Sequence, residues 1–446
     1  MDDKIKQYAK EEFNKRNNEL CLIASENYPS QDVLNASGSI FQLKYAEGFA
    51  GKRYYQGCEV VDKVEQECID TCLKLFGAED KYLANVQPNS GASANMIVYN
   101  SILDPGDFIL APDVKSGGHI SHSHPKSFIS KYHNVITYDV TDDGILDYDQ
   151  IEELATGYLP KLIICGASNY PRKIDFAKFK NIANKIGAYL MADIAHISLL
   201  VAKGLHPSPI GFADFITFTT HKMIKGPRGG VILYKKKFDK QIKLSTIPGL
   251  FGGPLEHQIY AKLVCFSEAL KPESKKYAEQ IIKNAQAIAT VFEIHNIPIV
   301  SGKTENHLMT IDLSNYDISG RELAIELEKC GIICNCNTIP NDPRSFMETS
   351  GIRIGTPAIT TRGFDEVDSK YLAQAMAFLI DCYRKDKKYE SEEEKQAEIK
   401  HYENFLSIAV YRLCERYPLS KIYPDFVLTT NKKDDIIESE SEKKDE

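Results

Sequence analysis

Lys222 lies in a short segment whose residue types could support covalent chemistry. The segment reads Thr217-Phe-Thr-Thr-His-Lys-Met-Ile-Lys-Gly-Pro-Arg-Gly-Gly230, between the apolar runs 212–218 and 231–234. The lysine therefore belongs to a turn of hydroxyls, histidine and glycines between two expected strands. Burial or nearby charge lowers the pKa of such an amine, which can then form a Schiff base with an aldehyde. The alternative is a solvated lysine in a surface loop.

Two more charged residues occupy positions where burial is expected. Asp193 directly follows the apolar run 189–192, and His196 comes three residues later. An unpaired buried carboxylate is costly, so Asp193 needs a partner, either a nearby arginine or a protonated ring nitrogen of a cofactor. Arg353 alternates with two isoleucines in a short strand candidate. It is either a bidentate clamp for a substrate carboxylate or one half of a structural ion pair.

Two glycine-containing segments could contact a ligand. Residues 44–57 are dense in Gly, Tyr and charge, which favours a ligand or a partner subunit over a plain surface loop. Residues 87–95, Gln-Pro-Asn-Ser-Gly-Ala-Ser-Ala-Asn, open an expected helix. Free backbone N–H groups and the positive helix end are suited to phosphate, although many helices begin with Ser and Gly.

Three histidines, His119, His122 and His124, follow Gly117-Gly118 in an expected loop. Their alternate spacing could indicate a metal site, but no carboxylate or cysteine set lies beside them. A single histidine that stacks on a flat ligand is the preferred interpretation, and no metal is expected.

The elements that position these residues alternate between strand and helix. Asp175 is the expected cap of a crossover helix that ends at Gly187, which implies parallel strands on both sides. After Pro298 the pattern changes to a smaller α+β mixture, preceded by one long expected helix, 258–294. The seven strand candidates of the first part are 83–86, 108–111, 135–138, 162–167, 189–192, 215–218 and 231–234. We therefore predict an α/β fold with a mostly parallel sheet and ligand groups at the carboxyl ends of its strands.

The totals narrow the class of protein. The chain has 446 residues, 43% hydrophobic and 26% charged, as is ordinary for a soluble globular protein. A net charge of -8 argues against a general nucleic-acid binder, and no apolar run is long enough to span a membrane. Eleven singly spread cysteines and an N-terminus without an apolar signal core favour a cytoplasmic enzyme. The expected organisation is an arm (1–58), a large domain (59–294), a small domain (295–430) and a disordered acidic tail (431–446).

Separated motifs along residues 10–420 resemble those of the serine hydroxymethyltransferase family. They are Leu22-Ile-Ala-Ser-Glu-Asn27, Lys44-Tyr-Ala-Glu-Gly48, Gly51-Lys-Arg-Tyr-Tyr55, Val86-Gln-Pro88, Gly117-Gly-His119, Asp193-Ile-Ala-His196, Thr219-Thr-His-Lys222, Gly226-Pro-Arg-Gly229 and Arg353-Ile-Gly-Thr-Pro-Ala358. The resemblance implies fold type I of the pyridoxal 5'-phosphate (PLP) enzymes, with a seven-stranded large domain and a smaller α+β C-terminal domain. It also implies the reversible conversion of serine and tetrahydrofolate to glycine and 5,10-methylenetetrahydrofolate.

The same resemblance assigns roles to individual residues. Lys222 would hold PLP as an internal aldimine, Asp193 would pair with the pyridinium nitrogen, and His119 would stack on the ring. With Glu47, these three are the expected catalytic residues. The other expected cofactor contacts are Ser90, Gly91, Ala92, Ser168, His196, Thr219 and His221, with Tyr45 and Gly253 from a neighbouring subunit.

The substrates are assigned in the same way. Ser25, Tyr55 and Arg353 would hold the amino-acid carboxylate, and Glu47 would act on the serine hydroxyl. The expected folate contacts are Glu47, Tyr54, Gly117, Gly118, Ile120 and Asn337. Because Tyr45, Glu47 and Tyr55 would serve the partner's site, a homodimer or homotetramer is expected.

Four places depart from the family pattern. The phosphate turn usually reads Ser-Gly-Ser and here reads Ser90-Gly-Ala92, a loss on the order of 1 kcal/mol for one hydrogen bond. Lys115-Ser116 and His122-Ser-His-Pro125 replace customary residues beside the expected folate pocket, and Phe251 stands where glutamine is usual. Two alternatives therefore stay open: a folate-independent PLP aldolase that acts on β-hydroxy amino acids, and a catalytically weakened paralogue that serves as a binding subunit.

Overall fold

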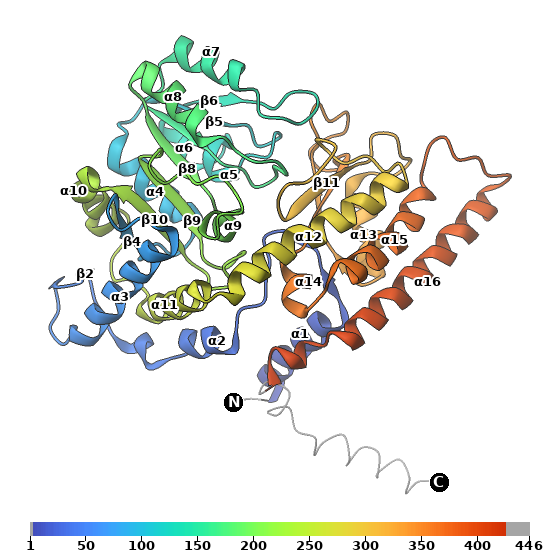
Figure 1. Cartoon of the computed structure of the whole chain (residues 1–446), viewed down its shortest axis with the longest axis horizontal. Helices are drawn as coiled ribbons and strands as arrows, with labels where there is room; N and C mark the ends of the chain where they lie inside the picture. Colours follow the sequence, from blue (N-terminus) through green and yellow to red (C-terminus); the bar gives the residue numbers. More distant parts are fainter. Residues whose placement is uncertain (1–2, 425–446) are drawn as a thin grey trace, which may run out of the picture.

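A seven-stranded sheet with one reversed strand organises the larger part of the molecule (Figure 1). The computed structural model describes residues 3–424. The strand order is β4-β10-β9-β8-β7-β5-β6, and only β10 runs antiparallel to its neighbours. The strands are β4 (Tyr82–Asn85), β5 (Phe108–Pro112), β6 (Asn134–Tyr138), β7 (Leu162–Cys165), β8 (Tyr189–Asp193), β9 (Phe215–Thr219) and β10 (Gly230–Lys235). All seven predicted strands belong to this sheet, so the predicted α/β class is confirmed.

The helices between the strands begin and end at residues that favour helix termini. Helix α8 (Phe176–Ile186) begins at Asp175, whose carboxylate accepts hydrogen bonds from two backbone N–H groups, and ends at Gly187 with φ 73°. It buries Phe176 and Phe179 and connects the parallel strands β7 and β8. The other helices of this part are α3 (Glu59–Phe76), α4 (Gly91–Ile102), α5 (Ile120–Ser123), α6 (Phe128–Tyr132), α7 (Tyr148–Tyr158), α9 (Ser198–Ala202) and α10 (Asp239–Leu244).

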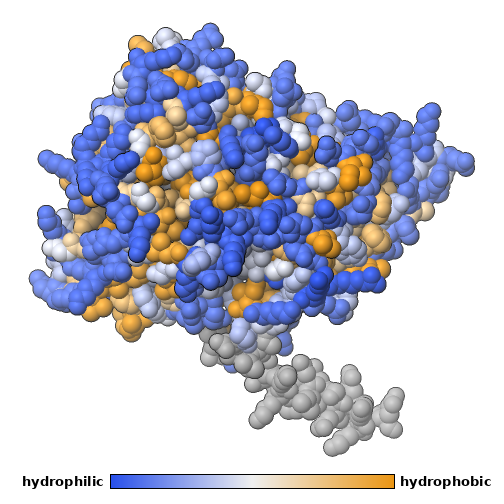
Figure 2. All heavy atoms as spheres, in the orientation of Figure 1, coloured by the Kyte–Doolittle hydropathy of each residue, from blue (hydrophilic) through white to orange (hydrophobic). Residues whose placement is uncertain are grey.

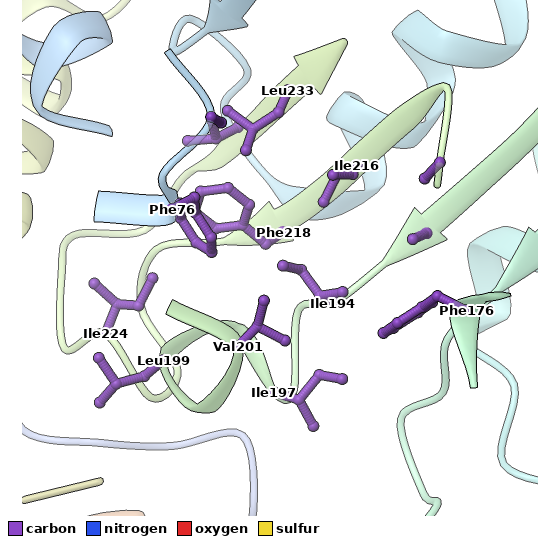
Figure 3. Close-up of a cluster of buried hydrophobic side chains, with 14 of the residues drawn as sticks. Phe76, Phe176, Ile194, Ile197, Leu199, Val201, Ile216, Phe218, Ile224 and Leu233 are labelled. Atoms are coloured by element: carbon purple, nitrogen blue, oxygen red, sulfur yellow. The ribbon is translucent and has the colours of Figure 1, made fainter. Parts of the chain in front are cut away.

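Both faces of the sheet are buried. Neighbouring strand residues alternate between two apolar clusters, so that Leu110 belongs to one and Ile109 to the other. On one face Phe76 of α3 packs against Phe218 of β9, with ring centroids 4.9 Å apart (Figure 3). The carboxyl edge of the sheet is consequently held rigidly from both sides.

A third apolar cluster surrounds a small antiparallel sheet, β11-β14-β13. Helix α12 (Glu273–Ile294) joins the two parts, because Ala278 packs in a cluster of the large sheet and Ala285 in this third cluster. The strands are β11 (Leu308–Asp312), β12 (Ile332–Ile333), β13 (Asn335–Asn337) and β14 (Gly351–Gly355). The helices are α13 (Gly320–Lys329), α14 (Pro357–Arg362), α15 (Glu366–Asp381) and α16 (Glu392–Arg416).

The prediction of a single helix over residues 258–294 is wrong. The chain forms α11 (Glu256–Leu270) and α12 (Glu273–Ile294), with a break at Lys271 and Pro272. Lys271 is extended, with ψ 150°, as is usual for a residue that precedes proline. The proline therefore ends one helix and begins the next.

The N-terminal segment runs along both parts. Helix α1 (Asp3–Asn18) contacts α16, and β1 (Leu20–Cys21) pairs with β12. Then follow α2 (Gln31–Ser37), the 3-10 turn Ile40–Leu43 and the hairpin of β2 (Gly48–Phe49) and β3 (Lys52–Arg53). Figure 2 shows hydrophobic residues at the lower left of the surface, in the region where Figure 1 places α2 and α3. The tail predicted over 431–446 lies outside the described residues, and the domain boundaries stay predictions.

Candidate active site

A cavity of about 480 Å³ opens at the carboxyl edge of the large sheet. Strands β8 and β9, the beginning of α4, the short helix α5 and strand β14 contribute its walls. Of the residues expected to form a site, the cavity brings together Ser25, Ser90, Gly91, Ala92, Gly118, His119, Ile120, Ser168, Asp193, His196, Thr219, His221, Lys222 and Arg353.

Lys222 lies in the connection between β9 and the reversed strand β10. Its side chain is buried, and its carbonyl accepts a hydrogen bond from Asn27 Nδ2 at 3.1 Å. Burial lowers the pKa of Lys222 to about 8, against the opposing effect of the Asp193 carboxylate, and Arg353 lowers it further. A neutral amine is therefore accessible close to neutral pH, as nucleophilic attack on an aldehyde requires.

Asp193 ends β8 and has neutral partners. Its Oδ2 accepts from Asn95 Nδ2 and from His122 Nε2, both at 2.9 Å, and its Oδ1 accepts from the Ala195 N–H at 3.0 Å. Burial alone would raise the pKa of Asp193, but the hydrogen bonds from His122 and Asn95 hold it well below its usual range. The arginine considered from the sequence is not among these partners.

His122 was not expected here. The sequence groups it with the residues beside the expected folate pocket, but α5 places it against Asp193, with 1% of its surface exposed. Its Nδ1 accepts the His119 N–H at 3.3 Å, so its Nε2 carries the proton that it donates to Asp193. Asn95 and His122 lie 98 and 71 residues from Asp193 along the sequence, and no local sequence pattern predicts either contact.

The beginning of α4 forms a cradle for an anion. Ser90 caps the helix, and a Cβ at Gly91 would lie 2.7 Å from Thr219 Cγ2. Thr219 Oγ1 and His221 Nδ1 are buried without a hydrogen-bond partner among the described residues. Arg228, which the sequence reasoning did not assign, lines the same wall and lies 3.3 Å from His221 Nε2 through its Nη1. Free helix N–H groups, two orphaned polar atoms and a guanidinium are suited to a phosphate.

Arg353 donates only to neutral groups. Its Nη1 bonds the Ser168 carbonyl and its Nη2 bonds Asn335 Oδ1, each at 2.9 Å, while Nε is buried without a partner among the described residues. Burial lowers the pKa of Arg353 to about 10, so the guanidinium is still charged at neutral pH. Since no ion pair within residues 3–424 includes it, its charge is left for a ligand anion.

His119 extends the wall of the cavity above Asp193. Its Nδ1 accepts from the Ser121 N–H at 3.2 Å and lies 2.7 Å from Ser121 Oγ. Burial lowers the pKa of His119 to about 4, and His122 lowers it further, so the ring is neutral. A flat neutral ring of this kind can stack on an aromatic ligand.

A second group of expected residues does not line this cavity. Tyr54 and Tyr45 are 69% and 59% exposed, and Tyr55 donates to Glu47 Oε2 at 3.2 Å. Gly253 lies beside Tyr45, since a Cβ there would be 3.1 Å from its ring. Two further expected folate contacts are also outside the lining: Gly117, which accepts from the Ser168 N–H at 2.7 Å, and Asn337 of β13.

The second group rests on a buried ion cluster that the sequence reasoning missed. Arg53 Nη1 donates to the carbonyls of Ala46 and Gly48, and its Nη2 lies 2.5 Å from Glu65 Oε2. Glu65 and Glu256 are both at least 98% buried, and Glu256 Oε1 lies 3.8 Å from Arg53. The segment that carries Glu47 is therefore fixed to α3 and α11.

A comparison with protein-family models gives one match. The model described as serine hydroxymethyltransferase matches residues 1–376 of the 446. The matched range contains every residue of the cavity and both groups described above. Helix α16 lies beyond it.

Proposed function

Because the chain belongs to the serine hydroxymethyltransferase family, whose members are PLP-dependent transferases, we propose that it interconverts serine and glycine with tetrahydrofolate as the one-carbon acceptor. The observation that carries the proposal is that a buried Lys222 amine and a buried Asp193 carboxylate line the same cavity. The products are glycine and 5,10-methylenetetrahydrofolate in the forward direction.

The residues present fit PLP. The start of α4, Thr219 Oγ1, His221 Nδ1 and Arg228 offer donors and positive charge to its phosphate. Asp193 offers a carboxylate to a ring nitrogen, and Lys222 offers an amine to an aldehyde. Bound PLP supplies an electron-withdrawing ring that stabilises negative charge at the α-carbon of an amino acid.

Asp193 controls the protonation of whatever ring nitrogen faces it. Its hydrogen bonds to Asn95 and His122 keep it ionised, and an anion in a buried site favours a proton on its neighbour. In the same cavity, Arg353 has an unpartnered Nε and a full charge with which to hold the carboxylate of serine or glycine. These two residues therefore orient the substrate between fixed charges.

The second group of residues supports a shared site. The family is generally oligomeric, and Tyr45, Glu47, Tyr54 and Tyr55 lie in this chain apart from the cavity that contains Lys222. In the proposed homodimer or homotetramer, each chain contributes Glu47 and Tyr55 to its partner's cavity, where Glu47 acts on the serine hydroxyl. Tyr54 and Asn337 would meet the folate.

The test is formation of labelled 5,10-methylenetetrahydrofolate from labelled serine by the PLP-loaded chain, with the Lys222→Ala variant as control. Product from the wild type alone supports the proposal. Full PLP loading with no folate product, but with cleavage of allo-threonine at a rate independent of folate, identifies the aldolase instead. No Schiff-base absorbance and no reaction would identify a binding subunit.

No helix within residues 3–424 is long and apolar enough to cross a bilayer. The proposed substrates are small and water-soluble, and their binding needs no such helix.

A further inference from the structure

His307 forms a buried pair with His196 behind the cavity. His196 follows β8 and lines the cavity, whereas His307 immediately precedes β11 of the small sheet. His196 Nδ1 lies 3.3 Å from His307 Nε2, and the two rings meet edge to edge with their planes 27° apart. The two side chains are 5% and 0% exposed, so water does not replace this contact.

The pair contains one shared proton, and its position can be assigned. An N–H···N hydrogen bond needs one donor and one acceptor. His307 Nδ1 is buried without a partner among the described residues. A buried N–H without an acceptor is rarer and less stable than a bare nitrogen, so His307 carries its proton on Nε2 and donates it to His196 Nδ1. His196 must then carry its own proton on Nε2.

The surrounding charges keep both rings neutral. Lys222 and Arg353 face the pair, as do His119 on the side of His196 and His206 on the side of His307. Burial lowers the pKa of His307 to about 3, and the nearby cations add to this effect. Burial likewise lowers the pKa of His196 far below its usual value. A neutral pair leaves one proton for the shared bond and one for the cavity.

We propose that His307 is a positioning residue that fixes His196 in the tautomer with its proton on Nε2, so that His196 presents a hydrogen-bond donor to the cavity. The acceptor is an oxygen anion held next to Lys222. Its identity as the ring oxygen of PLP rests on the proposed function, whereas the tautomer does not.

The backbone around His307 links this role to substrate binding. The His307 carbonyl accepts from the Thr356 N–H at 3.0 Å, and β11 pairs with β14, which carries Arg353. The small sheet thus positions both the arginine and the histidine tautomer. Movement of this sheet would change both together.

The experiment uses the full chain labelled with ¹⁵N-histidine, first freed of PLP and then reloaded. The nitrogen shifts of His196, assigned by loss of its signals in His196→Asn, report which nitrogen is protonated. We expect the proton on Nε2 in the wild type with and without PLP. In His307→Leu we expect the single tautomer to be lost, and in His307→Gln, whose amide can donate to Nδ1, we expect it to be kept.

A second readout is the pH titration of the visible absorbance of bound PLP. The midpoint should move by about one unit in His307→Leu, equivalent to 1.4 kcal/mol, and stay near the wild-type value in His307→Gln. His295→Gln is the matched control, because His295 is hydrogen-bonded to Asp381 of α15 and lies outside the cavity lining.

Two results would overturn the assignment: a proton on His196 Nδ1 in the wild type, or an unchanged tautomer and midpoint in folded His307→Leu. Failure of the wild type to form a Schiff base would instead contradict the proposed function. The nitrogen shifts of the PLP-free chain still decide the tautomer in that case.

Discussion

His122 Nε2 lies 2.9 Å from Asp193 Oδ2, and the imidazole has its other nitrogen occupied by the backbone N–H of His119. The carboxylate is thus stabilised by a neutral donor, which cannot neutralise its charge as an arginine would. A buried anion with neutral partners is free to pair with a cation that arrives with a ligand. This relationship leads to the first prediction.

Replacing His122 with phenylalanine should weaken PLP binding. A hydrogen bond to a charged group is worth about 1.5–3 kcal/mol, so we expect a loss in affinity of about 10- to 100-fold. Absorbance titration of the PLP-free variant with PLP measures it. His124→Phe is the control, since the His124 ring accepts a hydrogen bond from the nearby backbone N–H of Lys126 and not from a residue of the cavity. Equal affinities in both variants would show that the His122 contact does not matter.

The capture of PLP by the chain should depend on pH through Lys222. Because burial lowers the pKa of Lys222 to about 8, the reactive neutral amine should be half-formed near that pH. The initial rate of Schiff-base formation should therefore rise with pH and reach half its maximum at about 8, measured by stopped-flow absorbance. A midpoint at about 10.4, the pKa of an exposed lysine, would contradict this expectation. Lys222→Arg should show no such reaction.

Replacing Arg353 with lysine should affect serine more than PLP. The guanidinium has a planar pair of donors that a lysine lacks, and one lost charged hydrogen bond corresponds to about a tenfold rise in KM for serine or more. PLP affinity should change by less than about threefold, because Arg353 lies on β14 and away from the phosphate cradle of α4. Steady-state kinetics and PLP titration distinguish the two effects. A large loss of PLP with an unchanged KM would contradict the assigned role.

Two inactive variants should restore activity when mixed. If Glu47 serves the partner's cavity, a hybrid of Lys222→Ala and Glu47→Gln chains contains one intact site and one doubly altered site. Random reassociation of equal amounts should then give about a quarter of the wild-type activity, because half of the dimers are hybrids with one good site in two. Activity measured after dilution from mild denaturant tests this. No recovery despite hybrid formation would place Glu47 in the site of its own chain.

Replacing Glu256 with glutamine should change the pH dependence of stability. Burial raises the pKa of Glu256 to about 8, Glu65 and Asp62 add to this, and Arg53 opposes it. A raised pKa means that the folded chain holds the proton more tightly. The stability from this group is therefore present below about pH 4.3 and is lost as pH rises through 8.

Glutamine does not ionise, so the variant does not lose this stability as the pH rises. Its free energy of unfolding relative to wild type should rise by about 3.5 kcal/mol between pH 5 and pH 8, as urea titrations would show. Glu59→Gln, at an exposed position of α3, is the control. A difference that is flat with pH would mean that Glu256 is ionised throughout.

The large sheet could be predicted because its signals are local. Each central strand is a short apolar run buried on both faces, and Asp175 and Gly187 cap the helix between two of them. Ser168, Asp193 and His196 could be placed for the same reason, since each lies at or shortly after a strand end. The break at Pro272 was also a local signal, and the apolar periodicity on both sides of it outweighed the proline in the prediction.

The support of the site could not be predicted in the same way. The bonds from His122 and Asn95 to Asp193 join residues far apart in sequence, and only the folded sheet brings them together. The ion cluster did have one signal in the sequence. Glu65 lies between Val61 and Cys68 at helical spacing on the buried stripe of α3, and a carboxylate there demands a buried cation. This signal predicts a buried cationic partner for Glu65, but it does not identify that partner as Arg53.

The reversed strand β10 separates the two strands from which the anchors of the proposed ligand arise. It lies between β4, which leads to the phosphate cradle at Ser90, and β9, which leads to Lys222. Neighbouring strands are about 4.8 Å apart, so the two anchors arise from strands about 10 Å apart, whatever the number of residues between them. Insertions in the surrounding loops would leave this spacing unchanged. The single strand inserted between β4 and β9 thus fixes where the chain leaves the sheet toward the two anchors.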